Sequence, residues 1–395
     1  MSKLEELIQQ YCPDGVEYKP LGDYLSYEQP TKYLVVNTKY DDSYLTPVLT
    51  AGQSFILGYT NEKEGIFQAS KDVPVIIFDD FTTSFHWVDF SFKVKSSAMK
   101  MLRPIDEKKA LFRYLFYCMK NILYVPGDHT RQWIGTYSQF EIPVPLLPVQ
   151  EEIVRILDNF TELQAELQAE LQKRIQQYNY YRDNLLSDFT PEQEPKECTL
   201  EEITTDIYSG ATPSKEKRDY WENGTIPWMS SGEVNLGQVY EVEGRITQLG
   251  YDKCSTRMVP EGSVVIALAG QGKTRGTVAI LRTSVCTNQS LAALVPNPDI
   301  VSGEYLYYYL KTQYSKLREV SSGDGTRGGL NLKMLRSYKV IVPSLKTQTQ
   351  IVAILDRFET LTNDLSQGLP AEIEKRKQQY EYYRDKLLTF KRKAA

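Results

Sequence analysis

Two short segments of this chain place a threonine and an arginine one residue after a Gly-Asp pair. Residues 127–131 read Gly-Asp-His-Thr-Arg, and residues 323–327 read Gly-Asp-Gly-Thr-Arg. An arginine can bind a guanine edge or a phosphate through two parallel hydrogen bonds, and a threonine adds a hydroxyl donor. The alternative is a salt bridge inside the domain, from each arginine to Asp128 or Asp324. The predicted nucleic-acid contacts from these segments are Thr130, Arg131, Thr326 and Arg327.

A second set of polar side chains lies between two apolar runs, 264–268 and 277–281. Short apolar runs favour strands, so the residues between them are expected in a connecting loop. Loops on a rigid scaffold often carry binding residues, and a solvated hairpin tip is the alternative. Two threonines occupy the equivalent place in the first half of the chain. The candidates of this set are Gln271, Lys273, Thr274, Arg275, Thr82 and Thr83.

Residues 267–274 also fit a relaxed Walker A pattern, with alanine in place of the first glycine. A genuine P-loop opens a helix whose N-terminus holds the phosphates, whereas here a β-type run, 276–281, follows. The chain also lacks the Asn/Asp-Pro-Pro-aromatic segment of a methyltransferase, and two histidines exclude a His-rich metal site. The sequence therefore argues against an NTPase, a methyltransferase and a His-rich metal site.

The charge distribution permits DNA binding without indicating it. The net charge is −5, but residues 151–206 alone carry fourteen acids and five bases, which leaves about +4 over the remainder. The chain opens without the apolar run of a signal peptide and has no apolar stretch long enough for a bilayer. Its five cysteines are scattered, which fits a reducing compartment. The expected location is the cytoplasm, with no membrane partner.

The elements that must position these residues come from a duplication. Eight residues between 150 and 163 recur 198 positions later, and nine residues between 176 and 186 recur 202 positions later. Residues 196–345 repeat residues 1–147 more loosely, so that 75–78 aligns with 264–267 and 114–117 aligns with 305–308. The shift is half of the chain length. The chain is therefore expected to contain two related halves.

The repeated segments have the pattern of long helices. Apolar residues follow one helical face, and glycine and proline are absent from 149–190, so this helix could run for about 40 residues, or roughly 60 Å. A helix of that length needs a partner, and its own duplicate is the obvious one; an ordinary core helix is the alternative. The residues predicted at the helix or subunit interface are Phe160, Leu163, Leu167, Leu171, Tyr178, Tyr181, Phe358, Leu361, Tyr380 and Tyr383.

The two helices differ in their middle parts. Residues 161–172 contain a four-residue repeat, Thr-Glu-Leu-Gln followed by two copies of Ala-Glu-Leu-Gln. The second copy is four residues longer here and contains Gly368 and Pro370. Because glycine and proline disfavour a helix interior, we expect a kink or break near 368–370.

The predicted fold is of the α/β (α+β) class. Short β-type runs at 33–36, 73–78 and 90–94 precede a helical run at 107–120, and a polar, proline-containing linker spans 190–195. The predicted parts are a first domain at 1–147, a first helix at 148–190, a second domain at 196–345 and a second helix at 346–392.

The full chain resembles a known family. The motifs that carry the resemblance are the segments 27–33, 78–83, 210–214, 220–221 and 226–228, the helix starts near 150 and 348, the Tyr-Tyr-Arg-Asp segments and the four-residue repeat. In their order over the chain, these resemble the specificity (S) subunit of type I restriction-modification enzymes, and the repeat resembles the spacer of the type IC subgroup.

This resemblance implies that each half is a target recognition domain for one half of a bipartite, asymmetric site in double-stranded DNA. It implies that the helices pack as an antiparallel coiled coil, set the spacer and dock two modification (methyltransferase) subunits. S-adenosylmethionine would then bind to those subunits, and ATP and Mg to restriction/translocase subunits. This chain itself would bind no cofactor and have no catalytic role.

Two alternatives remain open from the sequence. A coiled-coil scaffold that organises protein partners would explain the helices, but not two diverged domains with loop arginines. A specificity partner of a type IIB-like nuclease-methyltransferase would explain both.

Overall fold

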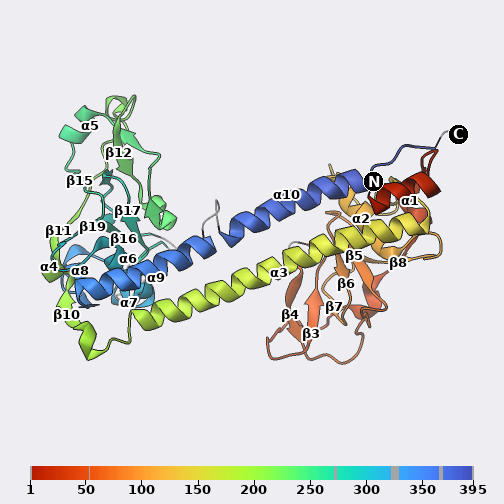
Figure 1. The fold of residues 1–395 in the computed structure, drawn as a ribbon, viewed down its shortest axis with the longest axis horizontal. Helices are drawn as coiled ribbons and strands as arrows, with labels where there is room; N and C mark the ends of the chain where they lie inside the picture. The colour runs from red at the N-terminus through yellow and green to blue at the C-terminus, as the bar shows by residue number, and fades with distance from the viewer. Residues whose placement is uncertain (1, 53, 271–273, 322–328, 364–367, 394–395) are drawn as a thin grey trace. The chain divides into compact units, whose positions relative to one another are not determined.

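The computed structural model describes residues 2–52, 54–270, 274–321, 329–363 and 368–393 (Figure 1). The chain divides into two compact units. The first contains Met1–Gln168 with Glu372–Ala395, and the second contains Ala169–Ala371. Each unit thus includes a part of both predicted long helices.

The first unit combines short strands with a buried helix. Its elements are α1 (Lys3–Tyr11), β1 (Glu17–Pro20), η1 (Leu21–Asp23), β2 (Leu25–Glu28), η2 (Pro30–Tyr33), β3 (Thr46–Leu49), β4 (Ile56–Thr60), β5 (Val75–Asp79), β6 (Phe85–Val88), β7 (Lys93–Val94), β8 (Met99–Pro104), α2 (Phe112–Asn121), η3 (Tyr137–Gln139), β9 (Glu141–Val144) and the beginning of α3 (Leu147–Leu185). Its described sheets have the orders β2-β8-β5-β6, β4-β3-β7 and β1-β9.

The core of the first unit lies between its largest sheet and the helices. Strand β5 is buried from Val75 to Phe78, and α2 buries almost every side chain on it. Leu157 from α3 and Leu388 from the end of the chain join the same apolar cluster. Each fully buried aliphatic or aromatic side chain contributes about 1.5–3 kcal/mol. The ends of both long helices are thus part of the core of this unit.

The second unit repeats this plan. Its elements are the end of α3, η4 (Pro191–Gln193), β10 (Lys196–Thr199), α4 (Leu200–Ile203), β11 (Thr204–Ser209), η5 (Arg218–Tyr220), β12 (Ile226–Met229), η6 (Ser231–Leu236), β13 (Gln238–Val239), β14 (Arg245–Ile246), α5 (Gln248–Asp252), β15 (Met258–Val259), β16 (Val264–Ala267), β17 (Val278–Leu281), β18 (Val285–Thr287), β19 (Leu291–Pro296), α6 (Gly303–Thr312), α7 (Tyr314–Val320), α8 (Leu332–Arg336), β20 (Lys339–Val342) and α9 (Leu345–Asn363). Its described sheets have the orders β11-β19-β16-β17-β13, β14-β12-β18-β15 and β10-β20.

The two units share a strand order as well as a sequence pattern. The order β2-β8-β5-β6 in the first unit matches β11-β19-β16-β17 in the second, and the pair β1-β9 matches β10-β20. Strands β5 and β16, which the sequence aligns, both lie inside their sheets. The mixed α/β architecture with two related domains is therefore confirmed.

Equivalent hydrogen bonds place each domain helix on the adjoining long helix. The side-chain oxygen of Gln150 accepts the N–H of Leu111, and that of Gln348 accepts the N–H of Ser302, each at 2.9 Å. Both glutamines are fully buried. A buried amide without partners would cost about 1–3 kcal/mol, so these contacts fix the start of α2 and of α6.

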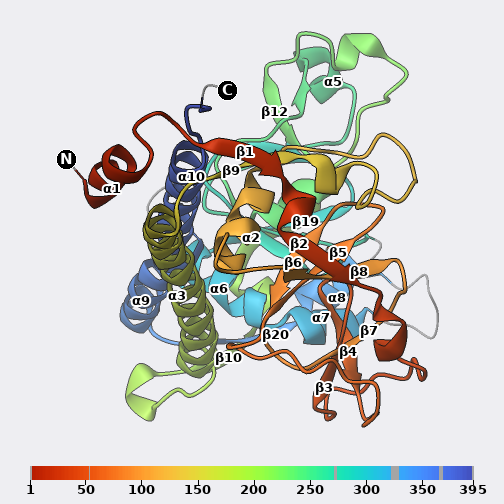
Figure 2. The same ribbon diagram turned by 90° about the vertical axis from the view of Figure 1, so that its right-hand side faces the viewer.

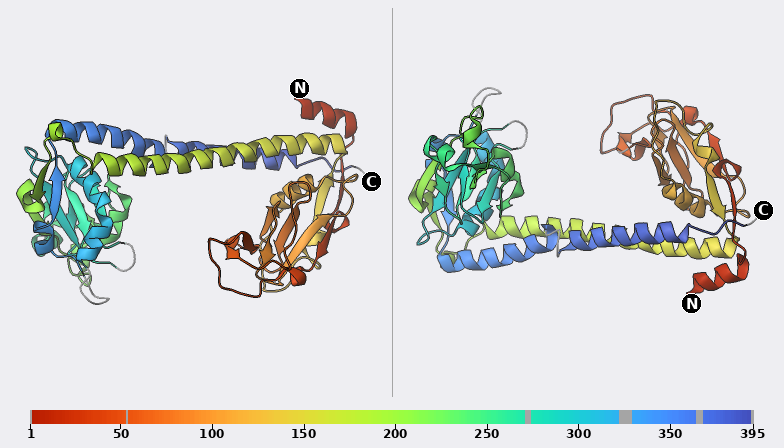
Figure 3. Two further views of the ribbon diagram at one scale, coloured as in Figure 1. Left: turned by 90° about the horizontal axis from the view of Figure 1, so that it is seen from below. Right: turned by 90° about the horizontal axis from the view of Figure 1, so that it is seen from above.

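Aromatic residues from the two long helical runs meet in each unit separately. In the first unit Phe160 stacks on Tyr383 of α10 (Leu369–Leu387), with ring centroids 5.5 Å apart. In the second unit Phe358 of α9 stacks on Tyr181 of α3 at 5.7 Å. Phe160 and Phe358 are equivalent in the duplication, as are Tyr181 and Tyr383. Figure 3 shows α3 beside α10 in the first unit and beside α9 in the second.

The second long helical run is described as two helices. Helix α9 ends at Asn363 and α10 begins at Leu369, with Gly368 in a bend and Pro370 in the first turn of α10. Proline is tolerated at that position because its missing N–H has no partner in a first turn. This is the place where the sequence analysis expects a kink; residues 364–367 lie outside the described part. Helix α3, by contrast, is continuous over 39 residues.

Three sequence-based boundaries are wrong in detail. The run 33–36 is not a strand: Val36 is 87% exposed, and its N–H donates to the carboxylate of Glu62. In the run 90–94 only Lys93–Val94 is a strand. The predicted helix at 107–120 begins at Phe112 instead. In the first case the N–H of Val35 still donates to the backbone oxygen of Val94 in β7 at 2.9 Å. At Val36 a side-chain carboxylate, which has no signal in the local sequence, replaces the strand as the hydrogen-bond acceptor.

An acidic side chain of α3 joins α1 to α3 in the first unit. Glu152 is 4% exposed and binds Lys3 at 3.0 Å and Arg155 at 2.6 Å. Its bond with Arg155, together with Lys3, lowers the pKa of Glu152 from 4.5 to about 2 despite burial, which opposes the shift. Figure 2 shows α1 next to α3 in this unit.

Replacing Glu152 with glutamine should lower the stability of the first unit by about 1 kcal/mol at pH 7, since two partly exposed ion pairs are lost. Because the folded pKa is lowered, the contribution of Glu152 is complete above pH 4.5 and is lost as the pH falls towards 2. The difference in unfolding free energy between the two proteins should therefore shrink at pH 3. Urea unfolding of both proteins at pH 7 and pH 3 measures this difference. A difference that is equal at the two pH values would contradict the lowered pKa of Glu152.

Candidate nucleic-acid interface

In the first unit, the turn between β5 and β6 lies against the loop that follows α2. The N–H of Gln132 donates to the backbone oxygen of Asp80 at 2.8 Å, and the N–H of Trp133 donates to the Asp80 carboxylate, also at 2.8 Å. These bonds tie the turn at 80–84 to the loop at 128–132. The structure thus brings together the two sets of candidates that the sequence places in the first half of the chain.

Asp80 is itself buried beside Lys100 of β8. Their charged atoms lie 3.4 Å apart, and both side chains are 1% exposed. The Lys100 ammonium also lies 4.6 Å from the centroid of the Tyr27 ring. Removing one partner of such a pair is costly, because the other charge then stays buried without a counter-charge. The Asp80–Lys100 pair therefore fixes the point where turn and loop meet.

The loop after α2 exposes the side chain of Arg131. The Asp128 carboxylate, the alternative partner for Arg131, accepts instead from Thr130 Oγ1 at 2.6 Å and from Gln132 Nε2 at 3.2 Å. The bond from Thr130 lowers the pKa of Asp128, so this carboxylate stays charged. Within the described residues the side chain of Arg131 makes no ion pair. A free guanidinium on a braced loop is suited to a phosphate or a guanine edge.

One of the two threonines in the β5–β6 turn faces solvent. Thr82 is exposed, and its N–H donates to Asp79 Oδ1 at 2.8 Å. Thr83 is 8% exposed, has a φ of 58°, and donates its hydroxyl to the backbone oxygen of Thr82 at 2.7 Å. The adjacent Phe81 ring stacks on His129 with 4.5 Å between centroids. Thr82 is therefore better placed than Thr83 to contact another molecule.

The second unit has a comparable contact at the equivalent place. The N–H of Leu330, in the segment before α8, donates to the backbone oxygen of Leu268, directly after β16, at 3.0 Å. Arg318 of α7 donates to the backbone oxygen of Arg275 at 3.3 Å. Thr274 and Arg275 are half-buried on this loop. The other four predicted contacts of this half lie outside the described residues, so their roles stay predictions: Gln271, Lys273, Thr326 and Arg327.

The Walker-like segment leads into a strand and not into a helix. Residues 274–277, at the described end of this segment, form no helix and lead into β17 (Val278–Leu281), which pairs with β16 in an antiparallel manner. These described residues thus offer no helix N-terminus that could hold phosphates, and residues 271–273 lie outside the described part. In the part of the chain that the structure describes, no group of His, Cys, Asp and Glu side chains could hold a metal ion. No described helix is both long and apolar enough to cross a membrane.

The segment 210–214 has a structural explanation. A Cβ on Gly210 would lie 1.8 Å from the backbone oxygen of Thr287, so no larger residue fits. The indole N–H of Trp228 donates to the backbone oxygen of Ala211 at 3.0 Å, and that of Trp221 donates to Ser214 at 3.1 Å. The tryptophans thus hold the backbone of this segment in place.

The predicted interface residues differ in exposure. Leu163, Leu167 and Leu171 are half-buried along α3, and Leu361 is 39% exposed. The four predicted tyrosines form two equivalent pairs that differ in exposure. Tyr178 and Tyr380 are buried, whereas the side chains of Tyr181 and Tyr383 are 42% and 36% exposed. The buried hydroxyls of Tyr178 and Tyr380 have no hydrogen-bond partner among the described residues.

Comparisons with known proteins agree with this arrangement. Residues 13–177 and 193–375 match the family described as the type I restriction modification DNA specificity domain. The chain is 47% identical over 403 residues to the Escherichia coli type I restriction enzyme EcoR124I/EcoR124II specificity subunit, covering 99% of this chain and 97% of that protein. The chain belongs to the family of type I restriction-modification specificity subunits. Its role is DNA sequence specificity.

Other S subunits are similar at lower identity. The MjaIX specificity subunit of Methanocaldococcus jannaschii is 31% identical over 173 residues, which cover 42% of this chain and 39% of that protein. The crystal structure of a type I restriction-modification S subunit from M. genitalium matches the fold with a TM-score of 0.58 at 15% identity, covering 95% of this chain and 96% of that one. The likeness supports a shared two-domain fold.

In this S subunit, replacing Arg131 with alanine should weaken binding of the first half-site by about 1–3 kcal/mol, the usual value of a bidentate contact. Lysine at the same position should keep the attraction to phosphate but lose the paired hydrogen bonds. Electrophoretic mobility shifts measure the DNA affinity of both variants, each purified in complex with its modification subunits. Lys108, an exposed residue before the opposite end of α2, is the matched control. Equal affinity of the Arg131→Ala and Lys108→Ala proteins would leave Arg131 without a role in binding.

The sequence analysis missed the residues that hold the candidate loops. Asp80 and Phe81 lie within the segment 78–83, which contributes to the family resemblance, but nothing nearby indicates that they contact residues 129–133. Lys100 looks like an ordinary surface residue in a strand pattern. The ion pair of Asp80 with Lys100 could be predicted only if the pairing of β5 with β8 were already known.

Proposed function

We propose that this S subunit recognises a bipartite, asymmetric site in double-stranded DNA, with one half-site bound by each unit. The observation that carries the proposal is a contact found in each unit, on sheets of the same strand order. It joins the residues after a central strand, β5 or β16, to the segment that follows the domain helices. Arg131 and Thr82 would contact the first half-site, and Thr274 and Arg275 the second. One scaffold design with two different sets of loops fits two binding tasks of the same kind.

The helical segments 148–190 and 346–392 would set the spacer between the half-sites as an antiparallel coiled coil. The contacts of Phe160 with Tyr383 and of Phe358 with Tyr181 support this pairing inside each unit. The three leucines of the four-residue repeat lie one helical turn apart, and all are half-buried. A rigid helix is a simple means of fixing half-site spacing.

The same helices would dock two modification (methyltransferase) subunits. Tyr180 and Tyr382, which are equivalent in the duplication, are 64% and 61% exposed on α3 and α10. Exposed tyrosines are common in protein interfaces, where they bury a large area and keep a polar end. S-adenosylmethionine would bind to the modification subunits, and ATP and Mg to restriction/translocase subunits. This chain would supply no catalytic group or cofactor site, and it would act in the cytoplasm.

Methylation mapping tests the proposal. DNA from cells that express this chain with its modification subunit should carry N6-methyladenine on both strands of a split motif, and deletion of this chain should abolish that pattern. An unchanged pattern after deletion, with the modification subunit still present, would contradict the proposed role.

A further inference from the structure

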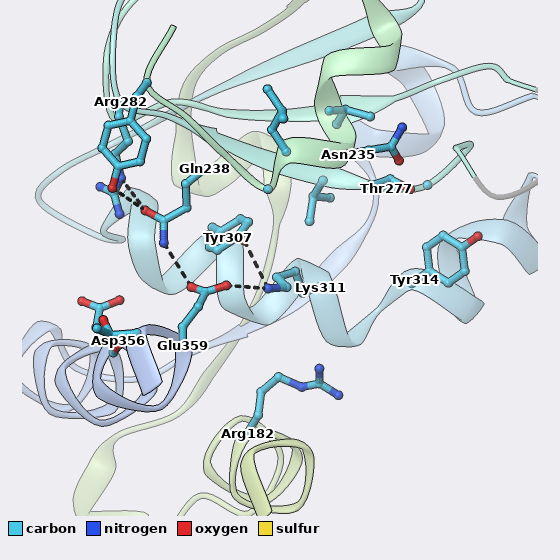
Figure 4. Close-up of a pocket in the computed structure, with 17 residues that line it drawn as sticks. Arg182, Asn235, Gln238, Thr277, Arg282, Tyr307, Lys311, Tyr314, Asp356 and Glu359 are labelled. Atoms are coloured by element: carbon cyan, nitrogen blue, oxygen red, sulfur yellow. Dashed lines mark hydrogen bonds and ion pairs between the residues drawn. The ribbon is translucent and has the colours of Figure 1, made fainter. Parts of the chain in front are cut away.

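A lysine on the domain helix of the second unit is held by internal partners. Lys311 of α6 lies 3.0 Å from Glu359 Oε1 and 3.1 Å from the hydroxyl of Tyr307 (Figure 4). Glu359 also accepts hydrogen bonds from Tyr308 at 2.7 Å and from Gln238 at 3.1 Å. A cavity of about 910 Å³ is lined by Lys311, Glu359, Tyr307 and Gln238. The ammonium of Lys311 therefore has its counter-charge within its own unit.

Lys120 on α2 occupies the equivalent position in the first unit. Tyr117 and Tyr308, three residues before the two lysines, donate to the equivalent carboxylates Asp158 and Asp356. The Lys120 ammonium lies 5.0 Å from the centroid of the Phe116 ring, as Lys311 lies 4.9 Å from that of Tyr307. The two lysines can thus be compared residue by residue.

Both internal partners of the lysine are missing in the first unit. Phe116 stands where Tyr307 supplies a hydroxyl, and Thr161 stands where Glu359 supplies a carboxylate. The Thr161 hydroxyl donates back to the oxygen of Leu157 at 2.9 Å. Across the described part of the chain, Lys120 makes no ion pair. Both units thus have the lysine, but the first unit lacks the hydroxyl and the carboxylate that bind its ammonium in the second.

The surroundings of Lys120 add positive charge. Lys377 and Arg384 line the same cavity, which measures about 520 Å³, and Glu381 is the one carboxylate among its described lining residues. Lys120 is an exposed residue, but partial desolvation of its ammonium beside α3 and α10 and the charges of Arg113 and Arg384 lower its pKa. An anion placed here would relieve this repulsion between like charges.

Two further features of the cavity indicate the class of ligand. Met119, Ile122 and Ile373 give it an apolar wall. Tyr380 also lines it, is 8% exposed, and has a hydroxyl without a partner among the described residues. A hydroxyl and an ammonium beside apolar side chains suit a carboxylate on an otherwise apolar peptide better than a duplex phosphate.

We propose that the cavity beside Lys120 binds a carboxylate side chain from an acidic segment of a protein partner, in the place that Glu359 fills in the second unit. The carboxylate pairs with Lys120, and the apolar neighbours of the acidic residue lie against Met119, Ile122 and Ile373. This binding site is separate from the loops that contact DNA in the proposed function, and it does not depend on them.

Competitive acetylation of the full chain tests the proposal. The rate of acetylation of Lys120 by acetic anhydride is measured by mass spectrometry, with and without a blocked Glu-Leu-Glu-Glu-Leu-Glu peptide. The peptide should slow the reaction about three- to fivefold, as expected for one ion pair near a surface. In the Thr161→Glu protein the internal carboxylate should protect Lys120 already, and the peptide should have no added effect. Asn159→Glu, which adds the same charge at an exposed position of α3, is the matched control and should retain the protection.

A reciprocal variant keeps the proposal testable if Thr161→Glu does not fold. Glu359→Thr should remove the counter-charge of Lys311 and make the acetylation of Lys311 sensitive to the peptide. Equal protection of Lys120 in the original and Thr161→Glu proteins would overturn the proposal, as would the absence of any protection. Protection by a short DNA duplex but not by the peptide would also overturn it, because the cavity would then bind phosphate.

Discussion

Deleting residues 165–168 is expected to move DNA methylation to sites whose half-sites are unchanged but lie closer together. The deletion removes one complete unit of the four-residue repeat, so the two remaining leucines of the repeat, Leu163 and Leu171, become four positions apart. Four residues shorten a helix by about 6 Å and rotate it by about 40°. One base pair corresponds to about 3.4 Å and about 34–36°.

The rotation caused by removing four helical residues thus matches that of one base pair well. The shortening of the helix is larger than the rise of one base pair, so a tilt of the helix must absorb the difference. We expect a spacer that is shorter by one or two base pairs, as measured by methylation sequencing of cells carrying the variant. Glu166→Lys, which changes the charge of the same repeat without changing its length, is the control and should leave the spacer unchanged. Altered half-site bases at an unchanged spacer would contradict the role of the helix as the spacer.

Replacing Lys100 with methionine is expected to destabilise the first unit strongly. It leaves the Asp80 carboxylate, which is 1% exposed, without its counter-charge. Breaking a buried pair in this way costs about 3–5 kcal/mol. Because Asp80 also accepts the N–H of Trp133, the loop with Arg131 should be displaced as well. Calorimetric unfolding should show a lower melting temperature for the transition of the first unit, and binding to the first half-site should weaken.

The double variant Asp80→Asn with Lys100→Met separates the charge from the hydrogen bond. Asparagine keeps an oxygen that can accept from Trp133, and no charge is then buried. We expect this protein to recover most of the lost stability, because exchanging a buried pair for neutral groups is often close to neutral. If the double variant is as unstable as Lys100→Met alone, the buried charge is not the cause of the loss.

The sequence predicted those features of the fold that repeat. Duplication identified both long helices, and the alignment of 75–78 with 264–267 located strands β5 and β16 at the same place in both sheets. The continuous apolar pattern and the absence of glycine and proline were sufficient for α3, whose 39 residues are close to the predicted 40. Periodicity is informative there because it extends over many turns.

Contacts between distant residues could not be predicted in the same way. Asp80 meets Lys100 and Trp133 across 20 and 53 positions, and Arg113 meets Asp158 across 45. None of these pairs has a spacing signal, because each depends on which strands and helices become neighbours. The run 33–36 shows the converse: its composition favours a strand, but it makes a single bridge to Val94, and from Val36 on the carboxylate of Glu62 accepts the backbone hydrogen bond. For the loops, the sequence could name donors but not which of them would be exposed, as the contrast of Thr82 with Thr83 shows.

The first unit also contains residues that are synthesised late. The N–H of Val16 donates to the backbone oxygen of Lys391 at 2.9 Å. The hydroxyl of Tyr18 donates to the backbone oxygen of Phe390 at 3.0 Å. Tyr380 lies in the same apolar core. A ribosome that adds roughly 5–20 residues per second needs roughly 10–45 s to pass from residue 168 to residue 393.

During that interval the nascent chain exposes the apolar surface that α10 later covers. The second unit is continuous from Ala169 to Ala371, so it can fold as soon as that stretch has left the ribosome. The unit whose synthesis begins first is thus the last to complete its core, and until then it is a natural client for chaperones.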